Sequence, residues 1–307
     1  MGQEESGDAI PRSSRRRRFL AGAALGGAAL AAHAAGAPER STGQDTGSTR
    51  SGTVELTRQG AIALITFNRP AQDNVLDQAD LDALVEVWRT YKTDDTLRVA
   101  IVTGKGGQAF CGGIDTSFVN RSAGPLPPPR DEGLRAYTSK QNKCWKPVIA
   151  AIDGFVAGPG LHFVLDADIA IATPEASFFD IHMHRTGSVP VFEPIEMARR
   201  LPYETVARFF LLGPNDPWTA DRALALGLIS EVVPRAGLMA RAINMARQIA
   251  ALDPSLVSAT LESLYKSREL GVRDAIERGL IIRQITGYRA APMASIPLRD
   301  LARPKAS

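Results

Sequence analysis

The stretch KPVIAAIDGFVAGPG, residues 146–160, joins an apolar strand to a glycine-rich loop. Its apolar run is typical of a strand that is buried on both faces. Gly158, Pro159 and Gly160 then precede LHFVLDAD (161–168), which we expect to form a short helix. A proline is tolerated in the first turn of a helix, because the N–H groups there have no partner within the helix. The stretch therefore predicts a strand, a loop suited to presenting backbone N–H groups to a ligand, and a helix.

Similar units lie on both sides of this stretch. The segments are VELTRQGAIALITFNRP (54–70, two strands), DQADLDALVEVWRTYK (77–92, a helix capped by Asp77), RVAIVTGKGG (98–107, a strand) and ADIAIAT (167–173, a strand). Strands that alternate with helices indicate β-α-β crossovers and a mostly parallel sheet that is covered on both faces. From about residue 194 the pattern predicts helices throughout.

The overall composition is that of an ordinary globular protein. The chain has 307 residues, of which 44% are hydrophobic and 22% are charged, and its net charge is +3. The basic residues are scattered apart from one N-terminal cluster, which argues against nucleic-acid binding. Cys111 and Cys144 are the only cysteines, and their spacing indicates neither a disulfide framework nor a metal-binding motif.

The N-terminal cluster lies in SSRRRRFLAGAALGGAALAAHAAGA, residues 13–37. It combines a run of arginines, a short apolar stretch and the small-residue site AHA (32–34), and so resembles a twin-arginine export signal. We expect residues 1–34 to be a signal that directs export to the periplasm or the extracellular space, and residues 35–51 to be a linker. The apolar stretch is too short for a stable membrane span. If the segment is instead a basic tail, the protein stays in the cytoplasm.

Four motifs follow one another along the chain with a characteristic spacing. They are ITFNRPAQDNVL (65–76), VAIVTGKGGQAFCGGIDTS (99–117), KPVIAAIDGFVAGPG (146–160) and LLGPNDPWTADRALALGLISEVVP (211–234). On these motifs the chain, over about residues 54–265, resembles the crotonase (enoyl-CoA hydratase/isomerase) superfamily. The resemblance implies an α/β fold of the crotonase-like (ClpP/crotonase) type, with a spiral of β-β-α units over residues 52–193. It also implies a helical C-terminal region, residues 194–307, that supports assembly as a homotrimer or hexamer.

The resemblance further implies an acyl-CoA thioester substrate, with coenzyme A as part of the substrate and no separate cofactor. In this chemistry two backbone N–H groups stabilise the enolate oxygen. By position the first N–H belongs to Ile114, whereas the second would belong to Pro159, which has none. Either Gly160 supplies a substitute donor at the start of the helix, or the site has a single donor and thioester chemistry is slow or absent. The expected substrate-binding set is completed by Gly113, Asp115 and Val75, although Asp115 could instead cap a helix over residues 116–120.

Two histidines occupy the acid/base positions that the resemblance implies. Hydratases of this family carry one glutamate after the glycine loop and a second about twenty residues later, and these positions here hold His162 and His182. Imidazole titrates near neutral pH, and the start of a helix disfavours its protonated form, so we expect His162 to be the base and His182 its partner acid. Asp180 and Glu193 are candidates for an additional acid/base carboxylate. Alternatively, each histidine packs in a satisfied hydrogen bond and takes no part in chemistry.

The histidines also allow a metal-binding alternative. His182 and His184 are two residues apart, so on a strand they would point to the same side, and His162 would have to face them. Three imidazoles suit zinc or copper. No carboxylate is clearly placed to orient these ligands, and we therefore expect no metal.

Three functions are open at this point. The first is an enzyme, a lyase or isomerase, that acts on an acyl-CoA thioester through an enolate, with histidines in place of the glutamate pair. The second is an exported hydrolase of the same fold that acts on a carbonyl substrate without coenzyme A, such as a β-diketone, because coenzyme A is scarce outside the cytoplasm. The third is a non-catalytic ligand-binding protein. The fold alone does not distinguish them. The proline-rich segment 123–130 is a candidate lid over the site.

Overall fold

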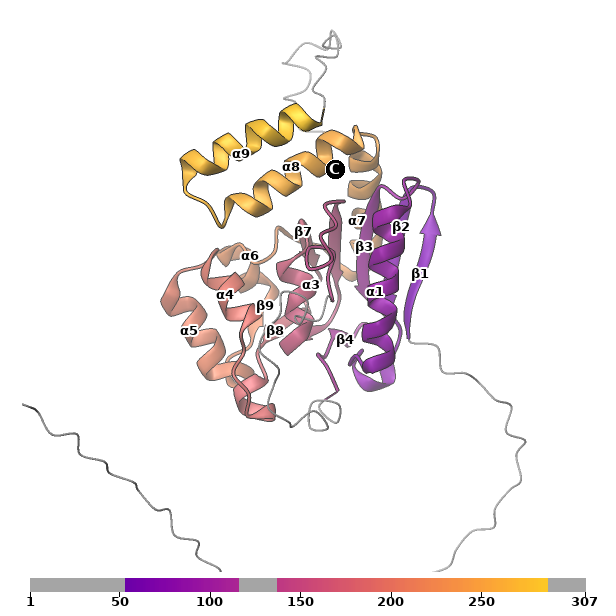
Figure 1. Cartoon of the computed structure of the whole chain (residues 1–307). Coiled ribbons are helices and arrows are strands. Elements are labelled where there is room, and N and C mark those ends of the chain that lie inside the picture. The colour runs from indigo at the N-terminus through magenta and orange to yellow at the C-terminus, as the bar shows by residue number, and fades with distance from the viewer. Residues whose placement is uncertain (1–52, 116–136, 287–307) are drawn as a thin grey trace, which may run out of the picture. The chain divides into compact units, whose positions relative to one another are not determined.

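The computed structural model describes residues 53–115 and 137–286 of the chain (Figure 1). The signal expected over 1–34, the linker over 35–51, the lid at 123–130 and the helix over 116–120 lie outside these residues. Among the residues that the structure describes, no helix is both long enough and apolar enough to cross a membrane.

Six strands form the larger of two sheets, in the order β1-β2-β3-β5-β7-β10. Their bounds are Val54–Gln59 (β1), Ile62–Phe67 (β2), Val99–Gly104 (β3), Val148–Ile152 (β5), Ile169–Ala172 (β7) and Glu231–Val232 (β10). The β1–β2 pair is antiparallel, and all the pairs from β2 to β10 are parallel. The mostly parallel sheet predicted from the apolar runs is therefore confirmed.

The smaller sheet has the order β4-β6-β8-β9. Its strands are Ala109–Cys111 (β4), Phe155–Ala157 (β6), Ser177–Phe179 (β8) and Trp218–Thr219 (β9). Three times the chain passes from a strand of the larger sheet straight into one of the smaller sheet: β3 into β4, β5 into β6, and β7 into β8. Gly154 makes the second of these turns at a φ of +80°, where a Cβ would overlap the backbone of Gln108. This repetition forms the predicted spiral.

The helices are Gln78–Thr93 (α1), Leu161–Leu165 (α3), Phe192–Ala198 (α4), Tyr203–Leu212 (α5), Ala220–Leu226 (α6), Arg235–Ala250 (α7), Pro254–Ser267 (α8) and Val272–Ile285 (α9). Helix α1 begins with a capping box between Asp77 and Asp80, which confirms the predicted cap. The expectation of helices throughout the region after residue 194 is wrong in one respect, because β9 and β10 add short strands to the two sheets there.

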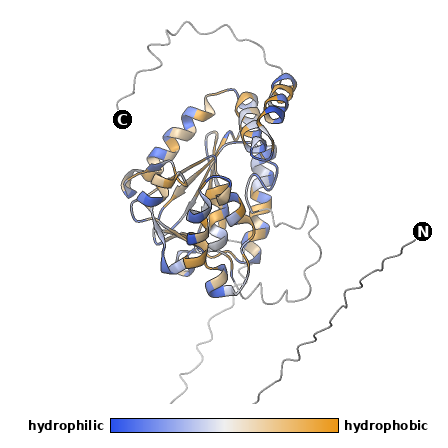
Figure 2. Ribbon diagram, turned by 90° about the vertical axis from the view of Figure 1, so that its left-hand side faces the viewer, coloured by the Kyte–Doolittle hydropathy of each residue, from blue (hydrophilic) through white to orange (hydrophobic). Residues whose placement is uncertain are grey.

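The hydrophobic core lies on both faces of the larger sheet. Along β3, Val99 and Ile101 pack in a cluster with Ala242 of α7, whereas Ala100 and Val102 pack in the cluster that contains α1 and α3. This alternation follows from the two-residue period of a strand. In Figure 2 hydrophobic and hydrophilic residues alternate along the surrounding helices, as expected for helices that turn one face to a core. Cys111 and Cys144 are both free and buried in this core.

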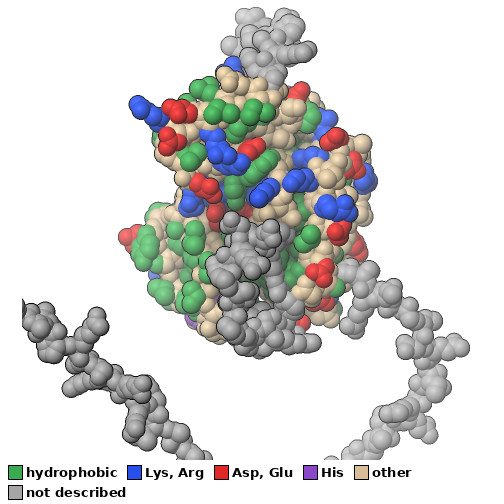
Figure 3. Space-filling model, viewed as in Figure 1, with side chains coloured by type: hydrophobic (Ala, Val, Ile, Leu, Met, Phe, Trp, Pro, Cys, Tyr) green, Lys and Arg blue, Asp and Glu red, His purple; other side chains and the backbone are tan. Residues whose placement is uncertain are grey.

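Helices α8 and α9 pack against each other at one end of the molecule. Hydrophobic side chains lie between charged ones on their surface (Figure 3). The exposed members are Leu256, Leu264, Val272, Ile276, Leu280, Ile281 and Ile285. Trimerisation through this region stays a prediction.

Candidate active site

Three neighbouring strands of the smaller sheet carry the loops of the site. β4, β6 and β8 are parallel, so their carboxyl ends meet at one edge. β4 leads to Gly113 and Ile114, β6 to the Gly158–Gly160 turn and His162, and β8 to Asp180 and His182. Ligands of α/β proteins commonly bind at such an edge. The sheet thus gathers residues that are far apart in the sequence.

The Gly158–Gly160 turn is a single 3₁₀ turn that leads into α3. Gly158 has a φ of +47°, a conformation that residues with a side chain rarely adopt. A Cβ on Gly160 would lie 2.5 Å from the carbonyl oxygen of Cys111, so this glycine lets the turn approach β4 closely. Pro159 fits between them because its nitrogen needs no partner in the first turn.

His162 lies in the first turn of α3 and is 9% exposed. Its ring stacks on that of Phe192, with 4.1 Å between the centroids and 16° between the planes, and Tyr137 meets it edge-on at 5.5 Å. Its Nδ1 lies 3.0 Å from Nε2 of Gln141, and its Nε2 lies 3.1 Å from Oε1 of Glu193. Both ring nitrogens are therefore engaged.

Glu193 comes from the first turn of α4 and is 2% exposed. Burial by itself raises the pKa of Glu193, but the hydrogen bond from His162 and the electrostatic attraction of His182 outweigh burial. The pKa of Glu193 lies below its ordinary value as a result. This carboxylate is therefore ionised at neutral pH and able to accept a proton.

His182 begins a π-helical turn, His182–Thr186, directly after β8. Its Nδ1 lies 2.7 Å from Oδ2 of the fully buried Asp180, whose Oδ1 accepts the backbone N–H of His182 at 3.0 Å. Burial lowers the pKa of His182, but the hydrogen bond to Asp180 and the charges of Glu193 and Asp180 raise it further, so the net shift is upward. The structure therefore favours an imidazolium that can donate a proton.

The free nitrogen of His182 faces the carboxylate of Glu193. The distance from Nε2 of His182 to Oε1 of Glu193 is 3.8 Å, too long for a direct hydrogen bond. A bound group or a water molecule that bridges the two atoms would contact both a proton acceptor and a proton donor. Such a pair is what general acid/base catalysis requires.

The backbone N–H of Ile114 points away from the neighbouring strand segment. Leu76 donates its N–H to the carbonyl of Gly113, and its own carbonyl accepts the N–H of Asp115, both at 2.9 Å. Because successive residues of an extended strand direct their backbone groups to opposite sides, the N–H of Ile114 lies on the side opposite Leu76. It is thus available to a ligand on that side.

Pro159 lies next to this donor. A Cβ built on Gly113 would lie 3.3 Å from Cδ of Pro159, which is bonded to the backbone nitrogen and occupies the direction of a missing N–H. Gly160 is the last residue of the same 3₁₀ turn, and its role as a substitute donor stays a prediction. Val75 packs close to Gly112, on the strand segment that holds Ile114.

Residues 57–282 match the family model described as enoyl-CoA hydratase/isomerase. The chain belongs to this family. (E)-benzylidenesuccinyl-CoA hydratase of Thauera aromatica is 31% identical over 229 residues, which cover 73% of this chain and 86% of that protein. Carnitinyl-CoA dehydratase of Escherichia coli K12 is 31% identical over 223 residues, which cover 72% and 84%.

A solved structure of another family member supports the same assignment. The enoyl-CoA hydratase/isomerase from Mycobacterium paratuberculosis superposes with a TM-score of 0.68 at 30% identity, and the match covers 78% of this chain and 91% of that chain. The crotonase-like fold that the sequence motifs predicted is therefore confirmed.

The structure does not bring together the three histidines of the metal alternative. His184 bonds through Nε2 to the carbonyl of Leu211 at 3.1 Å, away from His162. The strand assumed for residues 182–184 is wrong, because a π-helical turn there sends His182 and His184 in different directions. Within residues 53–115 and 137–286, no group of three His, Cys, Asp or Glu side chains is arranged to hold a metal ion.

The structure brings together all four residues that the sequence predicted as acid/base candidates. They are His162, His182, Asp180 and Glu193. Sequence reasoning missed Gln141, which lies in an irregular turn 21 residues before His162. It also missed the ring of Phe192 beneath His162. A turn without periodicity carries no signal of this kind, although the position of Phe192 beside Glu193 could have suggested an aromatic wall.

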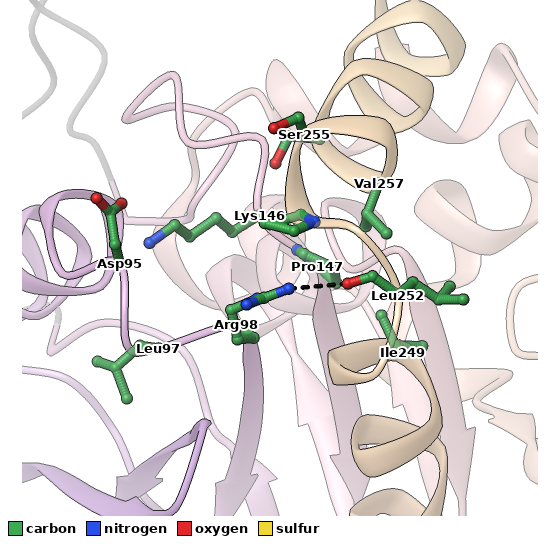
Figure 4. A pocket seen from close by; sticks show the side chains of 11 residues that line it. Asp95, Leu97, Arg98, Lys146, Pro147, Ile249, Leu252, Ser255 and Val257 are labelled. Carbon is green, nitrogen blue, oxygen red and sulfur yellow. Dashed lines mark hydrogen bonds between the residues drawn. The ribbon is translucent and has the colours of Figure 1, made fainter. Parts of the chain in front are cut away.

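A separate cavity of about 460 Å³ lies where β3 and β5 begin, beneath the junction of α7 and α8 (Figure 4). Its two basic side chains, Arg98 and Lys146, are occupied by structural bonds. Arg98 donates to the carbonyl of Leu252 at 2.8 Å, and Lys146 donates to the carbonyls of Tyr91 and Asp94, each at 2.9 Å. We therefore place the chemistry at the histidine cluster rather than in this cavity.

Proposed function

We propose that this protein catalyses the reversible addition of water to the α,β double bond of an enoyl-CoA thioester, with Glu193 as the base and His182 as the acid. The observation that carries the proposal is the position of Oε1 of Glu193, 3.1 Å from Nε2 of His162 and 3.8 Å from Nε2 of His182. The names of the relatives, a hydratase and a dehydratase of CoA thioesters, support this reaction class.

In the hydration direction, Glu193 takes a proton from water while the water oxygen bonds to Cβ of the substrate. The electrons of the double bond move toward the thioester, and negative charge develops on the carbonyl oxygen, where the N–H of Ile114 stabilises it. The imidazolium of His182 then gives its Nε2 proton to Cα. A proton that returns from Glu193 to His182 across the 3.8 Å gap resets the pair.

His162, the residue expected from the sequence to be the base, has a different role in this scheme. Both of its ring nitrogens are bonded, to Gln141 and to Glu193, so it holds the Glu193 carboxylate in place instead of facing the substrate. Asp180 similarly holds His182 through Nδ1 and leaves Nε2 for the proton transfer. Each reactive group is thus oriented by a buried partner.

The test is a steady-state assay with crotonyl-CoA and longer enoyl-CoA thioesters, which follows the loss of the conjugated double bond. Glu193→Gln should lower kcat by about 10² to 10⁴, because it removes the base. Glu196→Gln is the matched control, since Glu196 lies one turn later on α4 and pairs with Arg268 at 2.9 Å. Equal turnover by the two variants, or turnover of a cyclic β-diketone without any turnover of thioesters, would overturn the proposal.

A further inference from the structure

The side-chain amide of Gln141 has a fixed orientation. Its Oε1 accepts the backbone N–H of Tyr137 at 2.8 Å and that of Thr138 at 3.4 Å. A backbone N–H can only donate, so the oxygen of the amide must face these two groups. Its NH₂ group then faces Nδ1 of His162, 3.0 Å away, and donates to it.

This donor decides where the proton of His162 resides. Because Nδ1 accepts a hydrogen bond, the neutral ring carries its hydrogen on Nε2, and Nε2 donates to Glu193 at 3.1 Å. An imidazolium would place an N–H at Nδ1 against the NH₂ of Gln141, two donors in contact. If Gln141 did not donate to Nδ1, the nearby carboxylate of Glu193 would favour protonation of the ring.

The turn that carries Gln141 is anchored on several sides. Thr138 donates its hydroxyl to Oδ2 of the buried Asp166, the residue that ends α3. Nε1 of Trp88 on α1 donates to the carbonyl of Tyr137 at 2.6 Å. Asn142 donates its side-chain N–H to the carbonyl of Thr138 at 2.8 Å. The amide of Gln141 is therefore held by the packed core.

We propose that Gln141 is a positioning residue that holds His162 as the neutral Nε2–H tautomer, an inference that rests on the proposed function. Glu193 then accepts a hydrogen bond from a neutral ring and does not form an ion pair with a charged one. The base then keeps a proton affinity suited to accepting a proton from water. A cationic His162 would weaken the base, since an adjacent positive charge stabilises the carboxylate.

The decisive readout is the ¹⁵N NMR spectrum of the histidine rings in the full chain, which contains four histidines. In the unmodified protein Nδ1 of His162 should be unprotonated and Nε2 protonated. Gln141→Glu keeps an oxygen for the N–H of Tyr137 but places a second acceptor at Nδ1, and it should give an imidazolium with both nitrogens protonated. Lys143→Gln, in the same turn and exposed, changes the net charge equally and should leave the spectrum unchanged.

The pH profile supplies a second readout. Gln141→Glu should lower kcat at least about tenfold with KM little changed, and should move the acidic limb of kcat to lower pH, because Glu193 becomes a weaker base. The titratable groups facing His162 are Glu193 from α4, Asp166 at the end of α3 and Tyr137, and His182 acts through Glu193. Gln141→Met, which loses all three side-chain hydrogen bonds, should give a mixture of tautomers if Gln141→Glu fails to fold.

The NMR result separates this inference from the proposed reaction. A protein that does not turn over enoyl-CoA but shows the Nε2–H tautomer and its change in Gln141→Glu would refute the reaction alone. A spectrum with Nδ1 protonated in the unmodified protein, or one that Gln141→Glu leaves unchanged in a folded protein, would overturn the positioning role.

Discussion

Restoring a backbone N–H at position 159 should raise the rate of thioester chemistry. Cδ of Pro159 occupies the direction of the missing N–H, next to Gly113 and the donor Ile114. One preorganised donor to an oxyanion accounts for roughly 10² to 10³ in kcat, or about 2.7 to 4 kcal/mol. Pro159→Ala and Pro159→Gly both supply that donor. An N–H in the first helical turn has no partner to lose, so the expected structural loss is only about 0.4 to 1 kcal/mol from greater freedom of the unfolded chain.

The assay is steady-state turnover of crotonyl-CoA, with the thermal midpoint of each variant as a check on folding. We expect kcat to rise by about 10²-fold in both variants, the lower end of the range, because the turn did not evolve around a donor there. Pro254→Ala is the matched control, since Pro254 also lies in the first turn of a helix, α8, and borders the separate cavity of Figure 4 instead of the site. If both Pro159 variants fold and their kcat is unchanged or lower, a missing donor does not limit the reaction.

Three further predictions concern the pH response and the assembly. His182→Gln should remove the alkaline limb of kcat/KM, because activity requires the imidazolium and is lost as pH rises through a pKa above the ordinary 6.5; an unchanged limb would exclude His182 as the acid. Asp166→Asn should stabilise the fold by up to about 3 kcal/mol at pH 8 in urea unfolding, because burial raises the pKa of Asp166 from 3.8 to about 6. In the unmodified protein, the stability linked to the raised pKa of Asp166 is complete below about pH 4 and is lost as pH rises through 6. The stability gained by Asp166→Asn should therefore vanish at pH 4. A gain that does not depend on pH would contradict this cause. Light scattering should give a trimer or hexamer, because Val272 and Ile285 of α9 are each 79% exposed, and a stable monomer at micromolar concentration would exclude it.

Local patterns were enough to predict the elements that position the site. The apolar run of β5, the cap at Asp77 and the proline that opens α3 each depend on neighbours within a few residues, and each occurs as expected. The family resemblance implied His162 and His182 as the acid/base positions, and the structure shows that the parallel strands β6 and β8 bring them to one edge.

Other parts of the site depend on contacts that no local pattern encodes. Glu193 lies in the first turn of α4, whose position is set by packing on α3 and α5, so its approach to His162 could not be derived from spacing. Alternation suggested a strand at His182–His184, but the left-handed Gly187 that ends the turn and the bond from His184 to Leu211 favour a helical turn. The role of Gln141 follows from the orientation of its amide, which depends on three-dimensional contacts and not on a local sequence pattern.

The histidines at positions 162 and 182 are balanced by carboxylates that come from other elements. A buried imidazole at position 182 without an anionic partner would lose its proton and leave no acid at the site. Asp180 is fully buried and Glu193 is 2% exposed, and each pairs with one of the two rings. Glutamate at both histidine positions would place four carboxyl groups at one strand edge, where mutual repulsion would raise their pKa values and keep several of them protonated. In the proposed mechanism the two histidines and the two carboxylates form one acid/base set, and we expect glutamate at both histidine positions to disable it.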